Sequence, residues 1–472
     1  MKRLYKVLIL LLPVVLYFSY FPVISLGKSE TMNFELSLPL VWLVVFDVVA
    51  LVEVIKNKKI GLILKNWWWL SFPAFATMTI LWSDNMIRGV LTCGIMWFIY
   101  FAIFAFVALK ENVWDERFRK YFWRVFFAAA LGACVWCVVQ CILDVVGVPR
   151  ENSLMCAGCV SEMFGFPHPN GFAIEPQFMG NLLLASAIVC GWFGLKNKKY
   201  YILMFVFAAG LFLTFSRGAI YAFIVAMIFL TMAMNSKYLS RDTLKAVRPS
   251  LRSRDKYFRV LQLWGIVAVS FLFSLNFQGI LTEVGPTNDT YVSGISKVIN
   301  HLSLGIIDFR GEKVEESSEE SYAPATELTE EKSQDAVFDG YVEESTNTRV
   351  KLTEAAMKVW TSDFKTVMVG VGIGGAGQAM FDAGETDSPK EIVQNEYASL
   401  LVEVGVVGMA LVIFTAVMVV RWVIKNGGES SPLLLTVMLA YAVTLMFFSG
   451  FANALQVYLL PAVLAVVCGR GK

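Results

Sequence analysis

The feature that most constrains this chain is a series of apolar blocks, each about 20 residues long, separated by shorter polar segments. A hydrocarbon core about 30 Å thick needs a helix of roughly that length to cross it. Lipid offers no hydrogen-bond partners, so a helix, which satisfies its own backbone, is the structure that such a block can adopt. The composition agrees, because 57% of the residues are hydrophobic and only 17% are charged.

These blocks predict an all-α, polytopic integral membrane protein with about twelve transmembrane helices. The first block resembles a secretory signal peptide in its basic start and apolar stretch. Its length, the lack of a clear cleavage site and the spans that follow favour a first membrane helix instead. The predicted spans are residues 6–26, 37–55, 67–82, 90–109, 125–147, 178–195, 201–215, 219–235, 260–281, 400–420, 433–449 and 452–468.

Basic residues give the predicted orientation, because Lys and Arg accumulate in the cytoplasmic loops of membrane proteins. The segments on one side hold 27 of the 40 Lys and Arg residues, whereas the short loops on the other side hold four. These four are Lys28, Arg88, Arg150 and Arg217. We therefore expect a protein of the cytoplasmic (inner) membrane with both termini in the cytoplasm.

A large loop interrupts the spans, so that nine predicted helices lie in 1–281 and three lie in 400–472. The loop, residues 282–399, is expected outside the cytoplasm and holds more than twice as many acidic as basic residues. Its middle, residues 312–344, lacks the apolar side chains needed to form a core and is predicted to be disordered. Residues 349–369 place apolar side chains at helical spacing, which predicts a helix on the membrane surface.

The cysteine and histidine content argues against a metal centre. Cys156 and Cys159 form a CxxC pair in a predicted outer loop, but the chain has no second pair and only two histidines. A zinc site usually needs four such ligands. The pair is therefore either a local disulfide or two reduced thiols, and no metal or cofactor is predicted.

Arg217 interrupts what would otherwise be one long apolar hairpin, in the sequence TFSRGAIYAF. One interpretation is a tight turn from which Arg217 reaches lipid headgroup phosphates. The other is an anion site, because a guanidinium binds phosphate through two parallel hydrogen bonds and keeps its charge. Ser216 and Gly218 would permit the turn in either case.

Two further polar clusters lie at the predicted outer edge. Prolines break the helix around Asn170 and Glu175, giving either an ordinary re-entrant connection or a backbone that lines a cavity. His168 lies in the same stretch and is more often structural than catalytic in such a setting. Farther along, the glycines between Gly370 and Gly377 resemble a nucleotide-binding loop only by composition, since the Lys-Ser/Thr pair is missing. We expect a flexible turn there, and we expect Glu403 in the next span to face a cavity or a partner.

Together the clusters resemble the O-antigen polymerase and O-antigen ligase superfamily of bacterial envelope glycosyltransferases. The resemblance covers most of residues 80–415, and it depends on the order of short motifs rather than on any single one. The matching pieces are Pro169, Asn170, Glu175 and Pro176, then Ser216-Arg217-Gly218, then the helix from Arg349 leading to Gly370–Gly374, and finally Asn395-Glu396-Tyr397 with Glu403, Gly405 and Gly408.

The resemblance implies a C-type glycosyltransferase-like fold that acts at the outer face of the membrane. It implies a polyprenyl-diphosphate-linked oligosaccharide as donor and a glycan acceptor, with inversion at the anomeric carbon and without metal or nucleotide sugar. Arg217 and Arg349 match the family's diphosphate-binding arginines. Gln394 occupies the position where many relatives, especially ligases, carry histidine, and glutamine cannot accept a proton near pH 7. Any catalytic base is left open among Glu175, His168 and Glu396.

We therefore predict a polymerase of surface polysaccharide repeat units, with a glycan ligase as the near alternative. A flippase or another transporter is the alternative of a different class, but it would be expected to place charges along a path through several spans. The expected partners are the lipid-linked oligosaccharide, the acceptor glycan and membrane lipids, with a chain-length regulator or a flippase as a further candidate. Nucleic acid is not expected as a partner.

Overall fold

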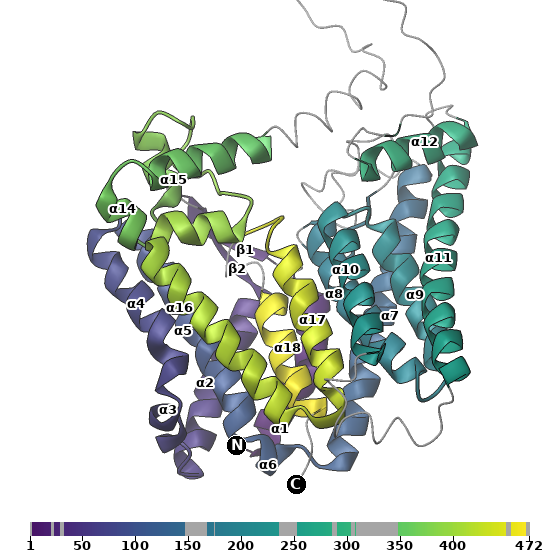
Figure 1. The fold of residues 1–472 in the computed structure, drawn as a ribbon, viewed down its shortest axis with the longest axis horizontal. Coiled ribbons are helices and arrows are strands. Elements are labelled where there is room, and N and C mark those ends of the chain that lie inside the picture. Colours follow the sequence, from purple (N-terminus) through teal and green to yellow (C-terminus); the bar gives the residue numbers. More distant parts are fainter. Residues whose placement is uncertain are drawn as a thin grey trace, which may run out of the picture.

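The computed structural model describes residues 2–19, 23–28, 33–146, 168–173, 175–235, 253–285, 290–303, 307, 348–449 and 455–468. In this part, long helices form one bundle, and a layer of shorter helices covers one of its ends (Figure 1). We call this the capped end. The start of the first helix lies at the opposite end (Figure 1).

The first half of the described chain forms α1 to α11 and one hairpin. The elements are α1 Lys2–Tyr17, β1 Val23–Lys28, β2 Asn33–Ser37, α2 Leu38–Lys56, α3 Gly61–Lys65, η1 Trp67–Leu70, α4 Ser71–Thr79, η2 Ile80–Trp82, α5 Met86–Ala108, α6 Lys110–Val113, α7 Glu116–Val145, α8 Pro176–Gly194, α9 Tyr200–Leu213, α10 Arg217–Asn235 and α11 Ser253–Val284. The layer at the capped end and the last membrane helices follow. They are α12 Tyr291–Leu302, a helix over residues 348–360, α14 Phe364–Val369, α15 Ala376–Asp382, α16 Glu396–Asn426, η6 Gly428–Ser430, α17 Ser431–Thr444 and α18 Leu455–Cys468.

The polytopic all-α prediction is confirmed, and each predicted span contains a helix. Among the described residues, seven helices are long and apolar enough to cross a membrane, and two shorter apolar helices accompany them. The boundary of the first span, 6–26, was wrong. α1 ends at Tyr17, and the chain then forms an antiparallel hairpin that pairs Val23 with Ser37. The β-branched and aromatic residues after Tyr17 favour extended backbone over helix.

Two other predicted elements are broken in the structure. The third span, 67–82, consists of α4 flanked by two 3-10 turns rather than one continuous helix. The surface helix predicted over 349–369 stops at Trp360, and α14 starts anew after Asp363. The Asp363 carboxylate accepts hydrogen bonds from the Thr366 backbone at 3.0 Å and from its hydroxyl at 2.6 Å. Such side-chain bonds favour a helix start over a helix interior.

α8 is the central helix of the bundle, and every residue from Gln177 to Trp192 is buried. Small residues let its neighbours approach closely, as is common where membrane helices pack. A Cβ added at Gly180 would lie 2.8 Å from the Cβ of Ala219 on α10. This contact near the first turns of α8 and α10 places the starts of both helices side by side at the capped end.

The glycine segment, residues 370–377, differs most from its prediction. We expected a flexible turn, but residues 372–377 are buried and the backbone is tied to distant parts of the chain. α16 departs from helical geometry at Gly405, where φ is 61°. The carbonyls of Val402 and Glu403 accept hydrogen bonds from Val371 and Gly372, each at 2.9 Å. The glycine segment is therefore a structural joint between α16 and the layer at the capped end.

Glu403 contributes to the same joint, and its partner is the backbone of the glycine segment. Its carboxylate accepts hydrogen bonds from the backbone of Gly374 and Ala376, and it lies in the field of Arg88. Converging N–H groups stabilise an anion in this way. The predicted disordered stretch 312–344 and the cysteine pair Cys156 and Cys159 lie outside the described residues.

Candidate functional site

A cavity of about 660 Å³ opens at the capped end. Its walls come from the first turns of α10, one face of the helix 348–360, the residues before α16 and the residues after α17. The residues that line it are Arg217, Tyr221, Arg349, Val350, Thr353, Glu354, Met357, Lys358, Thr361, Gln394, Asn395, Met446 and Phe447. Three residues predicted from the sequence, Arg217, Arg349 and Gln394, therefore share one cavity.

Arg217 and Arg349 are far apart in the sequence, but the segments that carry them both pack against Phe447. Arg349 donates a hydrogen bond from Nη1 to the Phe447 carbonyl at 3.5 Å, beyond the last turn of α17. Gly218, next to Arg217, packs against the same residue, since an added Cβ would lie 2.8 Å from the Phe447 Cβ. Both arginine side chains are half-buried. Two guanidinium groups that cannot lose their charge, facing one half-enclosed cavity, make a site that favours an anion.

A strained turn presents Arg217. α9 ends at Leu213, and Phe215 has a positive φ of 47°, which costs a residue with a side chain about 1–2 kcal/mol. The Ser216 hydroxyl accepts a hydrogen bond from the Ala219 backbone at 3.4 Å and helps to cap α10. The turn therefore starts α10 with Arg217 as its first residue.

The helix 348–360 presents Arg349 on a polar face. Arg349, Thr353 and Met357 recur every four residues and line the cavity, because positions four apart share one face of a helix. The opposite face carries Ala355 and Val359, which are buried. Val350, one of the apolar residues at helical spacing in 349–369, is not on the buried face but lines the cavity and is 49% exposed.

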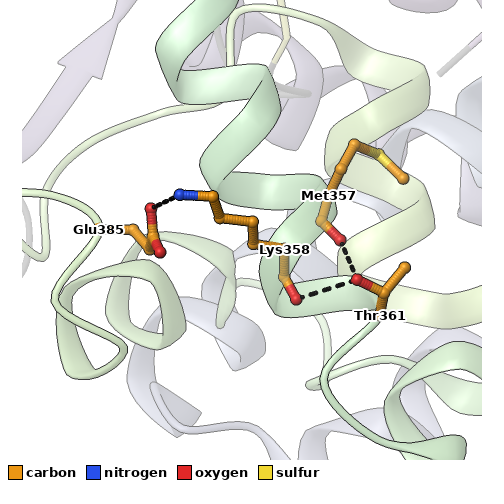
Figure 2. A network of polar contacts seen from close by, with 4 residues as sticks. All are labelled: Met357, Lys358, Thr361 and Glu385. Atoms are coloured by element: carbon orange, nitrogen blue, oxygen red, sulfur yellow. Dashed lines mark hydrogen bonds and ion pairs between the residues drawn. The ribbon is translucent and has the colours of Figure 1, made fainter.

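Polar contacts stabilise the C-terminal end of the helix 348–360 (Figure 2). Lys358 forms an ion pair with Glu385 at 2.8 Å, and the Thr361 hydroxyl donates to the Met357 carbonyl at 2.9 Å. The ion pair is solvent-accessible, so it contributes less than about 1 kcal/mol. Its role is to join the helix to the segment that leads toward Gln394.

Gln394 and Asn395 form the wall that precedes α16. The Asn395 side chain accepts hydrogen bonds from the backbone of Tyr397 and Ala398 at 3.1 and 3.2 Å, which is the usual work of a helix N-cap. Gln394 is exposed to the cavity. Its amide can both donate and accept, so it is able to orient a hydroxyl group.

Glu396 does not lie in this cavity. Its side chain is 4% exposed, and its backbone N–H donates to the Leu445 carbonyl at 2.9 Å. It borders a separate apolar groove of about 400 Å³ between α5, α16, α17 and α18. Gln394 and Asn395 precede α16 and line the cavity, whereas Glu396 is the first residue of α16 and faces the groove.

One further carboxylate lies within the field of Arg349, and another lines the cavity. Glu175 precedes α8, and the positive charge of Arg349 acts on it. Desolvation raises the pKa of Glu175, whereas Arg349 opposes that shift. Glu354 lines the cavity on the helix 348–360 and was missed in the sequence. It lies one helical turn from Val350 and Met357, which also line the cavity, and nothing in the sequence set it apart from the other charged residues of the loop.

His168 lies beside the Arg217 turn rather than in the cavity. Its ring is 6% exposed and its Nδ1 is 3.3 Å from the Thr214 carbonyl. Burial, the other histidine His301 and the charge of Arg217 lower its pKa well below the usual value. Asn170 in the same stretch is structural, because Gln140 donates to its side-chain oxygen at 2.9 Å.

No group of three or more His, Cys, Asp or Glu side chains with the geometry of a metal site occurs in the part of the chain that the structure describes. The ligand chemistry of the cavity is therefore that of arginine, amide, hydroxyl and carboxylate groups. Such a site can hold a phosphate-type anion beside a polyhydroxylated molecule.

Residues 202–413 match the model of a protein family described as O-antigen ligase. The matched segment contains Arg217, Arg349 and Gln394 and extends from α9 into α16. It supports the resemblance that the motifs indicated. A comparison with curated proteins gives no match.

Proposed function

We propose that this chain, whose residues 202–413 match the O-antigen ligase family, polymerises lipid-linked oligosaccharide repeat units into a surface polysaccharide. The observation that carries the proposal is the pair Arg217 and Arg349 in one cavity with Gln394. The cations suit the diphosphate of a polyprenyl-linked donor, and the amide suits a sugar hydroxyl.

In the proposed reaction, a hydroxyl of the acceptor glycan attacks the anomeric carbon of the donor. The bond from that carbon to the diphosphate oxygen breaks, and polyprenyl diphosphate leaves with inversion at the carbon. Arg217 and Arg349 stabilise the charge that develops on the leaving group, and fixed cations do so without reorganising. No metal is required for this role.

The proton of the attacking hydroxyl needs an acceptor. Of the three bases considered from the sequence, Glu175 is the one near Arg349, whereas Glu396 borders the apolar groove and His168 is held away from the cavity. We assign the proton to Glu175, with Glu354 as the alternative because it lines the cavity directly. Gln394 positions the acceptor hydroxyl.

The placement of the polar groups favours an enzyme over a flippase. The arginines and the amide gather at one end of the bundle instead of following a path through it. The Lys6–Asp115 and Lys196–Glu429 ion pairs involve lysines of the basic segments expected in the cytoplasm. With the positive-inside rule, this supports a cavity on the outer side of the cytoplasmic membrane.

The lipid part of the donor also has a candidate site. The lining of the apolar groove includes Glu396 and Tyr397. These residues directly follow Gln394 and Asn395, which line the cavity. Its lining is almost entirely aliphatic and aromatic, which suits a prenyl chain. A single donor could therefore place its diphosphate in the cavity and part of its chain in the membrane.

Loss of the gene tests the function and separates its two nearest forms. A polymerase predicts that surface glycan, resolved by gel electrophoresis, collapses to a single repeat unit, and that the wild-type gene restores the ladder. Long polymer that is no longer attached to its acceptor would indicate a ligase instead. An unchanged glycan ladder would contradict both.

Replacement of Gln394 by alanine should reduce the transfer rate moderately. The side chain supplies one or two positioning hydrogen bonds of about 1–1.5 kcal/mol each, so a loss of about 10–100-fold is expected. The check is the rate of polymer formation in membranes with matched protein abundance. Asp382→Ala, on an exposed side chain outside the cavity, is the control.

The pH dependence of transfer should show no histidine titration. The pKa of His168 is lowered well below its usual value, and that of His301 is lowered to about 3, mainly by burial. Both rings are therefore neutral at pH 7, and the rate should lack an inflection near 6.5. The unfolded chain binds these protons, so stability should fall as the pH drops from about 6.5 toward 3. A rate inflection near 6.5 that disappears in His168→Asn would contradict this account.

A further inference from the structure

The chain contains only two histidines, and folding brings them together. His168 comes from the stretch before α8, and His301 comes from the end of α12. Their rings lie 5.5 Å apart between centroids and are nearly perpendicular, at 89°. Both side chains are buried and neither lines the cavity.

Each histidine contacts one of two consecutive carbonyls in the turn before Arg217. The distance from His168 Nδ1 to the Thr214 carbonyl is 3.3 Å, and the distance from His301 Nε2 to the Phe215 carbonyl is 3.0 Å. A carbonyl oxygen only accepts hydrogen bonds, so each of these ring nitrogens carries the proton. The two histidines are therefore opposite tautomers, each fixed by its carbonyl.

The turn that they hold needs support, because Phe215 has a positive φ of 47°. α12 supplies part of it by lying over the turn. Val298 of α12 packs against Phe215, and Tyr221 on α10 donates a hydrogen bond to the Leu302 carbonyl at 2.5 Å. Thus α12 contacts the turn and the first part of α10 at several points.

We infer that His168 and His301 are positioning residues that fix the turn Thr214–Ser216 and thereby aim the Arg217 guanidinium into the cavity. The inference depends on the proposed function for its consequence, because Arg217 is the residue that would hold the donor diphosphate. The histidines act through hydrogen bonds of defined length and direction, and they exchange no proton with the substrate.

The two opposite tautomers allow a matched test. The amide nitrogen of asparagine can replace a histidine Nδ1, and that of glutamine can replace Nε2. His168→Asn and His301→Gln should therefore keep the hydrogen bond to the turn. His168→Gln and His301→Asn place the same functional group at the wrong distance and serve as controls of equal polarity.

The first measurement needs no substrate. Purified variants are treated with phenylglyoxal, which modifies arginine, and labelling of the peptide that contains Arg217 is followed by mass spectrometry. The matched variants should label at the wild-type rate, and the mismatched variants should differ from it by several-fold. Equal rates for asparagine and glutamine at both positions would overturn the inference, whatever the protein catalyses.

The second measurement is transfer from a polyprenyl-diphosphate oligosaccharide. The mismatched variants should raise the KM for donor by about 10–100-fold, the usual consequence of misplacing a binding group by about 1 Å. The KM for acceptor should be equal within each asparagine–glutamine pair. A change confined to the melting temperature would show a purely structural role. A wild-type protein that transfers nothing would contradict the proposed function, while the labelling result still decides the role of the histidines.

Discussion

Arg217→Ala and Arg349→Ala are each expected to abolish glycan chain growth while the protein still inserts and folds. Each arginine can make two charge-assisted hydrogen bonds to a diphosphate, and each bond is worth about 1.5–3 kcal/mol. Losing both bonds corresponds to about 10²–10⁴-fold in rate. The measurement is polymer length on gels, together with protein abundance in the membrane fraction.

Lysine at either position tests geometry separately from charge. An ammonium group keeps the charge but cannot make two parallel bonds, so Arg217→Lys and Arg349→Lys should remain severely impaired. Lys351→Ala removes a positive charge from the exposed side of the same helix as Arg349 and should leave chain growth intact. Equal losses for Lys351→Ala and Arg349→Ala would mean that overall charge matters and that the cavity does not.

Gly370→Ala is expected to lower the stability of the protein severely. Gly370 has a φ of 74° and ψ of 179°, a conformation that residues with a side chain essentially avoid. An added Cβ would lie 2.3 Å from the Glu403 backbone oxygen. Strain and overpacking together should cost about 2–5 kcal/mol, measured as lost monodisperse protein and a lower melting temperature in detergent.

Gly384→Ala is the matched control for that change. Gly384 also has a positive φ, 70°, but nothing lies within 4 Å of an added Cβ. It should therefore show only the backbone cost, about 1–2 kcal/mol. If the two alanine variants melt at the same temperature, the tight joint between the glycine segment and α16 is not what stabilises this region.

The membrane helices could be predicted from the sequence because, in lipid, an apolar block satisfies its backbone hydrogen bonds by forming a helix. Local hydropathy therefore located a helix in each predicted span. It did not locate the end of α1 at Tyr17 or the break at Asp363, since these depend on short-range competition between side chain and backbone. α12 was also missed, because its apolar residues lie on only one face of a short helix.

The glycine segment shows why local composition was insufficient. Glycines favour flexible backbone when it forms no hydrogen bonds with other segments. The sequence near Gly372 does not indicate which segments could supply such bonds. The partners are the Thr79 hydroxyl, which accepts from the Ile373 backbone at 3.0 Å, and the carbonyls exposed by the kink at Gly405. Both lie far away in the sequence, so only the folded chain reveals the joint.

The candidate site was predictable in part. Arg217, Arg349 and Gln394 were found because a polar residue among apolar spans is conspicuous and because the motifs resemble a known family. Glu354 was missed because charged residues are ordinary in a loop, and Glu396 was misplaced because it starts α16 and faces the apolar groove. The pairing of His168 with His301 required the three-dimensional structure.

The central claim is that Arg217 and Arg349 jointly bind the diphosphate of a lipid-linked donor. Its most direct test is transfer from purified polyprenyl-diphosphate oligosaccharide to an acceptor glycan in detergent, with a metal chelator present. The account predicts sustained turnover by the wild-type protein and none above background by a folded variant that carries both Arg217→Ala and Arg349→Ala. Near-normal turnover by that double variant would contradict it.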